Sequence, residues 1–417
     1  WKESNVRSIL SEHMGRIAGV TAEETRDRLL GAAASVFARL GYEKASISDI
    51  TAEAGSSPRL WLVDEVTSVV GWEQVVKELR DNTALAGDGV VLTGSSASGL
   101  DEAVRSLGAG RTNVADPFRL LLPMTFREVL IATGAEVPLP EPVSPDALQG
   151  ETASRSALSL VAFTDELDLA WQRYLETGGF PRAVGDWSRT GEVSRAFVRD
   201  LQAWLSAEVT WGEPVESAVG LLVALHHRTT NPLDVTETAV ALHTTRDKLR
   251  IRLERLTRSF AAFWCHQSDA EGHRVSHSQS KLYLIDPLLA RLPNLLDETE
   301  SPPDLTRSTE AMLGLALARS VTALHPERFL EQRAVMYART GGGGEVDFAP
   351  TSVAVGGSRF STCPIESKWA PSGWKSGART ARGKYGRGVV ATKNTTDVTG
   401  DVWALPAPVV ALFLDPL

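Results

Sequence analysis

The sequence has few cysteines and no long apolar run, and each absence excludes a class of protein. Its two cysteines, Cys265 and Cys363, cannot build a disulfide framework and fit a reducing compartment. No apolar run reaches the roughly 18 residues that a membrane-spanning helix needs, and the N-terminus shows no apolar signal-peptide segment. We therefore expect a soluble, cytoplasmic protein without a membrane partner.

The chain also lacks a strong excess of charge of one sign. It has 43 basic and 52 acidic residues, for a net charge of −9. Any affinity for DNA must therefore come from local basic patches and not from the whole surface. The length of 417 residues is too great for one hydrophobic core and predicts roughly two to four domains.

The phosphate-binding pattern GxxxxGK[ST] is missing as well. Such a loop wraps phosphates with its backbone N–H groups and supplies a lysine and a hydroxyl for the phosphates and Mg²⁺. The nearest string, "GARTARGKYG" (377–386), has the wrong spacing and no Ser or Thr after Lys384. Substantial ATP affinity is therefore not expected of this chain.

An acidic strand that usually accompanies such a loop is nevertheless present. "RLWLV" (59–63) predicts a buried strand, "GWEQVVKELRDN" (71–82) an amphipathic helix and "GVVLTGSSA" (89–97) a second buried strand. This order predicts a parallel βαβ unit, whose ligand site lies at the carboxyl ends of the strands. The residues expected there are Asp64, Glu65, Thr93 and Ser95.

Residues 21–57 predict two helices ahead of that unit. Gly41 is placed to end the first helix and Ser46 to begin the second. The run "AAASVFARLGYEKASISDITAEAG" resembles the DNA-binding head of the tetracycline-repressor family. That resemblance implies a recognition helix after Ser57, but the chain turns at Pro58 into the acidic strand.

From residue 59 onward the sequence resembles a group of prokaryotic AAA-type ATP-binding proteins that end in a nuclease-like domain of unknown function. The motifs are "LWLVDEV", "VVLTGSSA", "GAGR", "LPMTFREVL", "YLETGGFPRAV", "KLYLIDPLLA" and "GGEVDF…PIESKW". The resemblance implies Asp64 and Glu65 as the Walker B acids and Thr93 or Ser95 as the sensor. It also implies ATP and Mg²⁺ as ligands, a homo-oligomer, and Arg111 or Arg127 as the finger arginine.

A basic helix lies within a predicted winged helix at residues 216–295. Its cations and the stripe of Leu249, Leu253 and Leu256 lie on opposite faces. Two interpretations stay open: contact with DNA phosphates, or a solvated face partly neutralised by Asp247 and Glu254. The wing is expected to add His273, Arg274 and Lys281. The candidate DNA-binding residues on the helix are Arg246, Lys248, Arg250 and Arg252.

The last domain contains a pattern typical of metal-dependent PD-(D/E)xK nucleases. In "GEVDF", Glu345 and Asp347 share one face of a strand, and in "PIESKW", Glu366 and Lys368 do the same. In that arrangement the acids hold Mg²⁺ and the lysine positions the water, with Glu310 as a further ligand. The alternative is two ordinary amphipathic strands with charged outer faces.

We therefore expect an α/β multidomain protein with a P-loop-type ATPase core that is incomplete. Three functions stay open: an AAA-family ATP-binding protein that acts on DNA, an ATP-independent nuclease or DNA-binding module, and a repressor-type transcription regulator. Two family patterns meet at residues 56–58, each short of the element that its function needs. The expected parts are a helical segment (1–57), a partial ATPase core (58–140), a helical lid (150–215), a winged helix (216–295) and a restriction-endonuclease-like domain (305–417).

Overall fold

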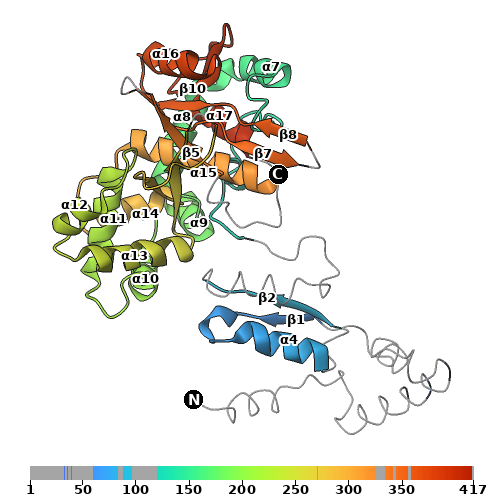
Figure 1. The fold of residues 1–417 in the computed structure, drawn as a ribbon, viewed down its shortest axis with the longest axis vertical. Helices are drawn as coiled ribbons and strands as arrows, with labels where there is room; N and C mark the ends of the chain where they lie inside the picture. The colour runs from blue at the N-terminus through green and yellow to red at the C-terminus, as the bar shows by residue number, and fades with distance from the viewer. Residues whose placement is uncertain are drawn as a thin grey trace. The chain divides into compact units, whose positions relative to one another are not determined.

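The chain divides into two compact units, residues 1–113 and residues 114–417. Apart from three helical positions, the repressor-like segment lies outside the described residues, and so does Arg111. Among the described helices, none combines the length and the apolar character that crossing a bilayer requires. The computed structural model describes Ala32, Ser35, Arg39 and residues 60–82, 88–95, 120–269, 271–324, 334–340, 344–355 and 358–415 (Figure 1).

The first unit contains the predicted βαβ arrangement. Strands β1 (Leu60–Val63) and β2 (Gly89–Leu92) run parallel, and α4 (Trp72–Asn82) connects them in the chain. Trp72 of α4 packs with Val66 and Leu92. Leu60 and Leu62 are 66% and 73% exposed, although their apolar run predicts a buried strand. The two leucines share one face of β1, and no other described element of this unit covers that face.

A group of helices opens the second unit. Phe126, Trp171 and Tyr174 form its aromatic centre, and the rings of Phe126 and Trp171 meet edge to face at 5.0 Å. After the third helix, a Cβ on Gly179 would meet the Met124 carbonyl oxygen at 2.0 Å, so only glycine fits there. The helices are α6 (Phe126–Ala132), α7 (Glu151–Ser159), α8 (Thr164–Thr177), α9 (Pro181–Thr190) and α10 (Arg195–Glu208).

Three helices and an antiparallel hairpin follow, which is the order expected of a winged helix. Asp234 and Thr245 cap the second and third helices, because each side chain accepts a backbone N–H from the first turn. Leu249, Leu253 and Leu256 are buried, as their spacing predicts. The elements are α11 (Glu216–Arg228), α12 (Val235–Ala241), α13 (Arg246–Arg258), β3 (Ala262–Gln267) and β4 (Lys281–Leu284), followed by α14 (Pro287–Leu296).

The hairpin belongs to a larger sheet of strand order β4-β3-β5-β6. Strand β3 pairs in parallel with β5 (Met336–Arg339), which pairs antiparallel with β6 (Glu345–Val346). Beyond β6, Phe348 exchanges two backbone hydrogen bonds of 2.9 Å with Ile365, the first residue of β9 (Ile365–Lys368). The hairpin and the C-terminal strands are therefore connected by backbone hydrogen bonds. The sequence instead predicts a domain boundary between residues 295 and 305.

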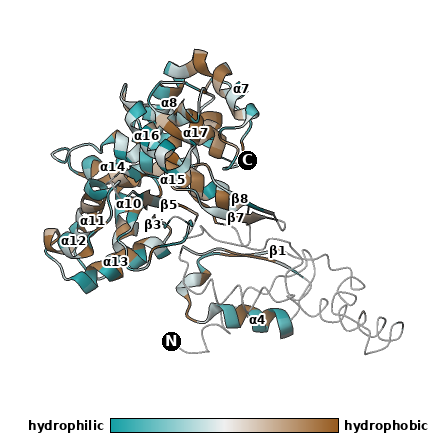
Figure 2. Cartoon of the chain, turned by 45° about the horizontal axis from the view of Figure 1, so that its top comes forward, coloured by the Kyte–Doolittle hydropathy of each residue, from teal (hydrophilic) through white to brown (hydrophobic). Residues whose placement is uncertain are grey.

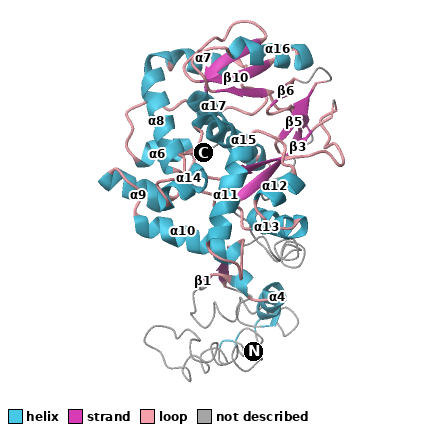
Figure 3. Cartoon of the chain, turned by 90° about the vertical axis from the view of Figure 1, so that its left-hand side faces the viewer, coloured by secondary structure: helices cyan, strands magenta, loops and turns pink. Residues whose placement is uncertain are grey.

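The last strands lie between helices (Figure 3). Strand β9 pairs in parallel with β10 (Gly388–Thr392), and β10 with β11 (Val402–Pro406). Both β10 and β11 are buried along their whole length, as parallel strands covered on both faces are. On one face Ala381 packs with Val390. The opposite face is covered by α17, which is hydrophobic along its length (Figure 2). The remaining elements are α15 (Leu305–Ala323), the hairpin of β7 (Ser352–Val355) and β8 (Ser358–Ser361), α16 (Trp374–Tyr385) and α17 (Ala407–Leu414).

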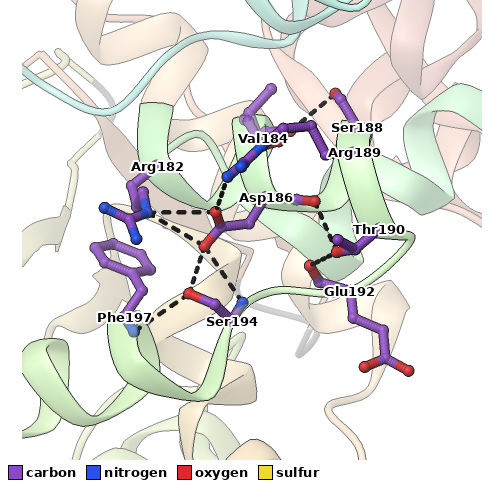
Figure 4. Close-up of polar contacts among 10 residues, drawn as sticks. Arg182, Val184, Asp186, Ser188, Arg189, Thr190, Glu192, Ser194 and Phe197 are labelled. Carbon is purple, nitrogen blue, oxygen red and sulfur yellow. Dashed lines mark hydrogen bonds and ion pairs between the residues drawn. The ribbon is translucent and has the colours of Figure 1, made fainter.

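A buried carboxylate joins α9 to α10 (Figure 4). Asp186 accepts a hydrogen bond of 2.5 Å from the Ser194 hydroxyl and pairs with Arg189 at 2.5 Å. Ser194 in turn caps α10 by accepting the backbone N–H of Phe197. The Ser194 hydrogen bond, more than any other contact, lowers the pKa of Asp186 from its ordinary value. These contacts fix the angle between two helices, which is a structural role.

Candidate functional site

The carboxyl ends of β1 and β2 bring together the four side chains that the sequence places there. The Thr93 hydroxyl donates to the Asp64 carboxylate, and the Ser95 hydroxyl donates to Glu65 Oε2 at 3.0 Å. Glu65 has a φ of 55°, a left-handed conformation that is uncommon for a residue with a side chain. This conformation turns the chain directly after Asp64, so that both carboxylates stay at the strand end.

The chemistry of this strand end fits the acidic half of a nucleotide site. Asp64 and Glu65 are exposed, and carboxylate oxygens are ligands that Mg²⁺ and its water shell accept. The hydroxyls of Thr93 and Ser95 lie beside them, where a γ-phosphate could be sensed. The other half of such a site is a phosphate-binding loop with the pattern GxxxxGK[ST]. The sequence does not contain this pattern.

Arg127, one of the two candidate finger arginines, points into the second unit. Its side chain lies at the start of α6 and is 2% exposed. Its Nη2 donates to the carbonyl oxygens of Pro140 and Leu412, at 2.6 and 2.7 Å. Burial lowers the pKa of its guanidinium. The guanidinium that would have to reach a phosphate is therefore bonded to these two carbonyl oxygens. In this arrangement Arg127 connects α6 to α17.

The basic helix α13 presents only part of its charge to solvent. Arg246 and Arg250 are exposed and stand one helical turn apart on the same face. Lys248 has a half-exposed side chain and pairs with Glu213 at 3.1 Å. Arg252 is 5% exposed and makes a two-point contact with Glu213. Of the four predicted DNA-binding residues, Arg252 is thus turned inward, because its position on the helix is next to the buried Leu253.

The acids of the C-terminal strands alternate as predicted. Val346 and Phe348 are fully buried, whereas Glu345 and Asp347 lie together on the other face. On β9, Glu366 and Lys368 share a face and pair at 2.9 Å.

The carboxylates of Asp347 and Glu366 each accept a backbone N–H from the other's segment. Glu366 Oε2 accepts the backbone N–H of Asp347 at 3.2 Å, and Asp347 Oδ2 accepts that of Ser367 at 2.9 Å. The two carboxylates are therefore neighbours, with Asp347 just after β6 and Glu366 on β9, where it pairs with Lys368.

A residue that sequence reasoning assigned to the wing lies in the middle of these acids. Lys281, the first residue of β4, is completely buried and is within 3.1 Å of three carboxylates. Tyr283, two residues on, donates to Glu310 Oε1 at 2.6 Å. The signal for this burial was the position of Lys281 in the apolar run "KLYLI", on the same strand face as Tyr283.

The protonation of this cluster follows from burial and charge. Burial raises the pKa of Glu310 to about 7 and that of Glu366 to about 8, and Asp347 adds to both shifts. Burial alone would lower the pKa of Lys281, but the surrounding carboxylates raise it well above its ordinary value. Lys281 is therefore a permanent cation at neutral pH.

These acids do not fit a Mg²⁺ ion in this arrangement. Across the described ranges, no group of three or more His, Cys, Asp or Glu side chains is arranged to hold a metal ion. The side chains predicted as ligands are paired with lysines instead, three of them with Lys281 and Glu366 with Lys368, so their arrangement supports no catalytic step through a metal. They are Asp347, Glu366, Glu310 and Glu345.

Comparison with known proteins bears on the N-terminal part of the chain. No curated protein and no solved structure matches the chain. A family model described as an AAA domain matches residues 6–130. The match includes β1, α4 and β2, and it runs through residues 21–57, where the sequence resembles a repressor head. Residues 6–130 therefore carry an AAA-type domain, and the chain is ATPase-like in this part.

Proposed function

We propose that this AAA-type, ATPase-like protein binds duplex DNA through the exposed face of α13. The observation that carries the proposal is the position of Arg246 and Arg250 at the beginning of the third helix of a three-helix and hairpin arrangement. In helix-turn-helix proteins the corresponding helix enters the major groove with its N-terminal residues.

Local geometry supports this orientation of α13. Thr245 caps the helix, so its first turn is fixed and its exposed arginines extend from a rigid element. The opposite face is anchored by Leu249 and Leu256, both fully buried. A rigid helix with cations on its free face can place them against phosphates with little ordering cost. The net charge of −9 of the whole chain does not prevent this, because a local basic patch is enough.

Two other functions have less support from the arrangement. Metal-dependent cleavage by the C-terminal acids is not part of the proposal, because three of them are already paired with the Lys281 ammonium. Repression by the N-terminal head is not part of it either, since residues 21–57 fall within the segment matched by the AAA-domain model. DNA binding, rather than DNA chemistry, is the activity that this proposal assigns.

The test is the salt dependence of binding to a fluorescent DNA duplex, measured by anisotropy with the 417-residue chain. Affinity should fall steeply with salt, and Arg246→Ala and Arg250→Ala should each flatten the log–log slope by about one. Arg155→Ala removes a 77% exposed arginine from α7 and should leave the slope unchanged. Salt-insensitive binding, or equal slopes in all variants, would refute the proposal.

Arg252→Ala serves as a second control because it separates folding from binding. Removing this side chain leaves Glu213 without its two-point partner, so the midpoint of thermal unfolding should drop. The slope of the salt dependence should stay that of the unaltered chain, since Arg252 does not face solvent.

A further inference from the structure

Three carboxylates from two elements converge on one buried nitrogen atom. Lys281 Nζ lies 2.9 Å from Glu310 Oε1, 2.7 Å from Glu345 Oε1 and 3.1 Å from Asp347 Oδ1. The ammonium also lies over the ring of Tyr337, at 5.4 Å from its centroid. The ammonium donates hydrogen bonds to Glu310 and Asp347, and Glu345 is a third ion-pair partner.

Other oxygens of the cluster also accept hydrogen bonds. Asp347 Oδ2 accepts the Ser367 N–H, and Glu310 Oε1 also accepts the Tyr283 hydroxyl. Glu366 pairs with Lys368 through Oε1 and accepts the Asp347 N–H through Oε2. A Mg²⁺ ion needs oxygen ligands at about 2.1 Å in an octahedral arrangement. To bind here, the ion would have to replace the hydrogen bonds that these carboxylates accept. It would also have to displace the Lys281 ammonium, which already lies between them.

We propose that the side chain of Lys281 is a fixed cation in the place that a divalent metal takes in metal-dependent nucleases, so that this acid cluster stabilises the fold and does not bind metal. The C-terminal domain then keeps a nuclease-like arrangement of acids without its metal. This inference does not depend on DNA binding by α13.

The strand position of Lys281 prevents it from leaving the cluster. Lys281 and Tyr283 lie on one face of β4, and Leu282 lies buried on the other. Main-chain pairing of β4 with β3 fixes that alternation from Lys281 to Leu284. The ammonium therefore cannot swing into solvent and open the site unless the strand itself is disrupted.

The cluster also explains why the hairpin and the C-terminal strands form one structure. Lys281 comes from the hairpin, whereas Glu310 comes from α15 and Asp347 follows β6. Breaking a buried ion pair by removing one partner is strongly destabilising, because it leaves the other charge uncompensated. The lysine thus links two regions that the sequence predicts as separate domains.

The first test is titration of the unaltered 417-residue chain with Mn²⁺ by isothermal calorimetry. The expected result is no saturable binding. Saturable Mn²⁺ binding that Asp347→Asn abolishes would overturn the inference, because it would show that the acids hold a metal in the presence of Lys281. The expected result concerns the unaltered chain and does not depend on whether a variant folds.

The second test creates the missing site. Lys281→Ala removes the cation and leaves three carboxylates facing each other, so the variant should unfold at a lower temperature and regain stability when Mn²⁺ is added. The double variant Lys281→Ala with Asp347→Asn should lose that response. Lys375→Ala, which removes an exposed lysine of α16, should show neither effect.

Lys281→Met is the second variant if Lys281→Ala does not fold, because methionine fills most of the space of the lysine stem. Its stability should also rise with Mn²⁺. A folded Lys281 variant that does not respond to Mn²⁺ would overturn the inference, since the acids would then be unable to replace one cation by another.

Discussion

At the scale of single residues, a buried histidine shows how position determines charge. His226 lies in the last turn of α11 and is 8% exposed. Its Nε2 accepts the backbone N–H of Asp304 at 3.0 Å, which requires that this nitrogen carry no proton. Burial, with Arg307 and His227 adding to it, lowers the pKa of His226 from 6.5 to about 4. The imidazole is therefore neutral in the folded protein.

This pKa predicts a loss of stability in mild acid. A base whose folded pKa is depressed contributes its stability above the unfolded pKa of 6.5 and loses it as the pH falls toward about 4. The loss is at most about 3 kcal/mol for this shift. Urea unfolding should therefore show a steeper decline between these pH values for the unaltered chain than for His226→Gln. Parallel declines would contradict the prediction.

Residue types and their alternation could be predicted from the sequence, but their partners could not. The two-residue period of a strand correctly paired Glu345 with Asp347 and Glu366 with Lys368. Lys281 was expected to belong to the wing, with His273 and Arg274. Its partner Asp347 stands 66 positions further on, and only the pairing of distant strands brings them together. Long-range pairing leaves little trace in a single sequence.

At the scale of elements, α16 packs tightly enough to need a glycine. A Cβ on Gly377 would lie 2.9 Å from Glu366 Cγ and 3.2 Å from Lys368 Cγ. The absent side chain lets α16 lie directly over β9 and exclude water from the Glu366 carboxylate. Gly383, in the same helix, has no atom within 4 Å of the position of a Cβ.

These two glycines give a matched pair of substitutions. Gly377→Ala should destabilise the protein by about 1 to 3 kcal/mol, because the helix must move away from β9. Gly383→Ala should instead stabilise it by roughly 0.5 to 1 kcal/mol, since alanine favours a helix and meets nothing there. Chemical unfolding of both variants measures the difference. Equal effects would mean that α16 does not rest on Glu366 and Lys368.

At the scale of the whole molecule, the two units contain different candidate sites. In the first unit Asp64 and Glu65 directly follow β1, and the family match gives that region an AAA-type character. The second unit contains the basic helix and the lysine-centred acid cluster. The strand, helix, strand order of the first unit and the basic helix α13 could be read from hydrophobic periodicity. The sharing of one sheet by the hairpin and the C-terminal strands could not, because β3 and β5 pair across 70 residues, as His266 and Met336 do.

The last prediction concerns nucleotide, which requires both halves of a site at once. Asp64, Glu65, Thr93 and Ser95 supply the acidic half, but the 417 residues contain no GxxxxGK[ST] loop to hold the phosphates. Purified chain should therefore show no ATP turnover above that of Asp64→Asn, because the carboxylates have no positioned phosphate to act on. Calorimetry with Mg-ATP should likewise give no tight binding. A micromolar dissociation constant that Asp64→Ala abolishes would contradict this prediction, since some other backbone segment would then have to wrap the phosphates.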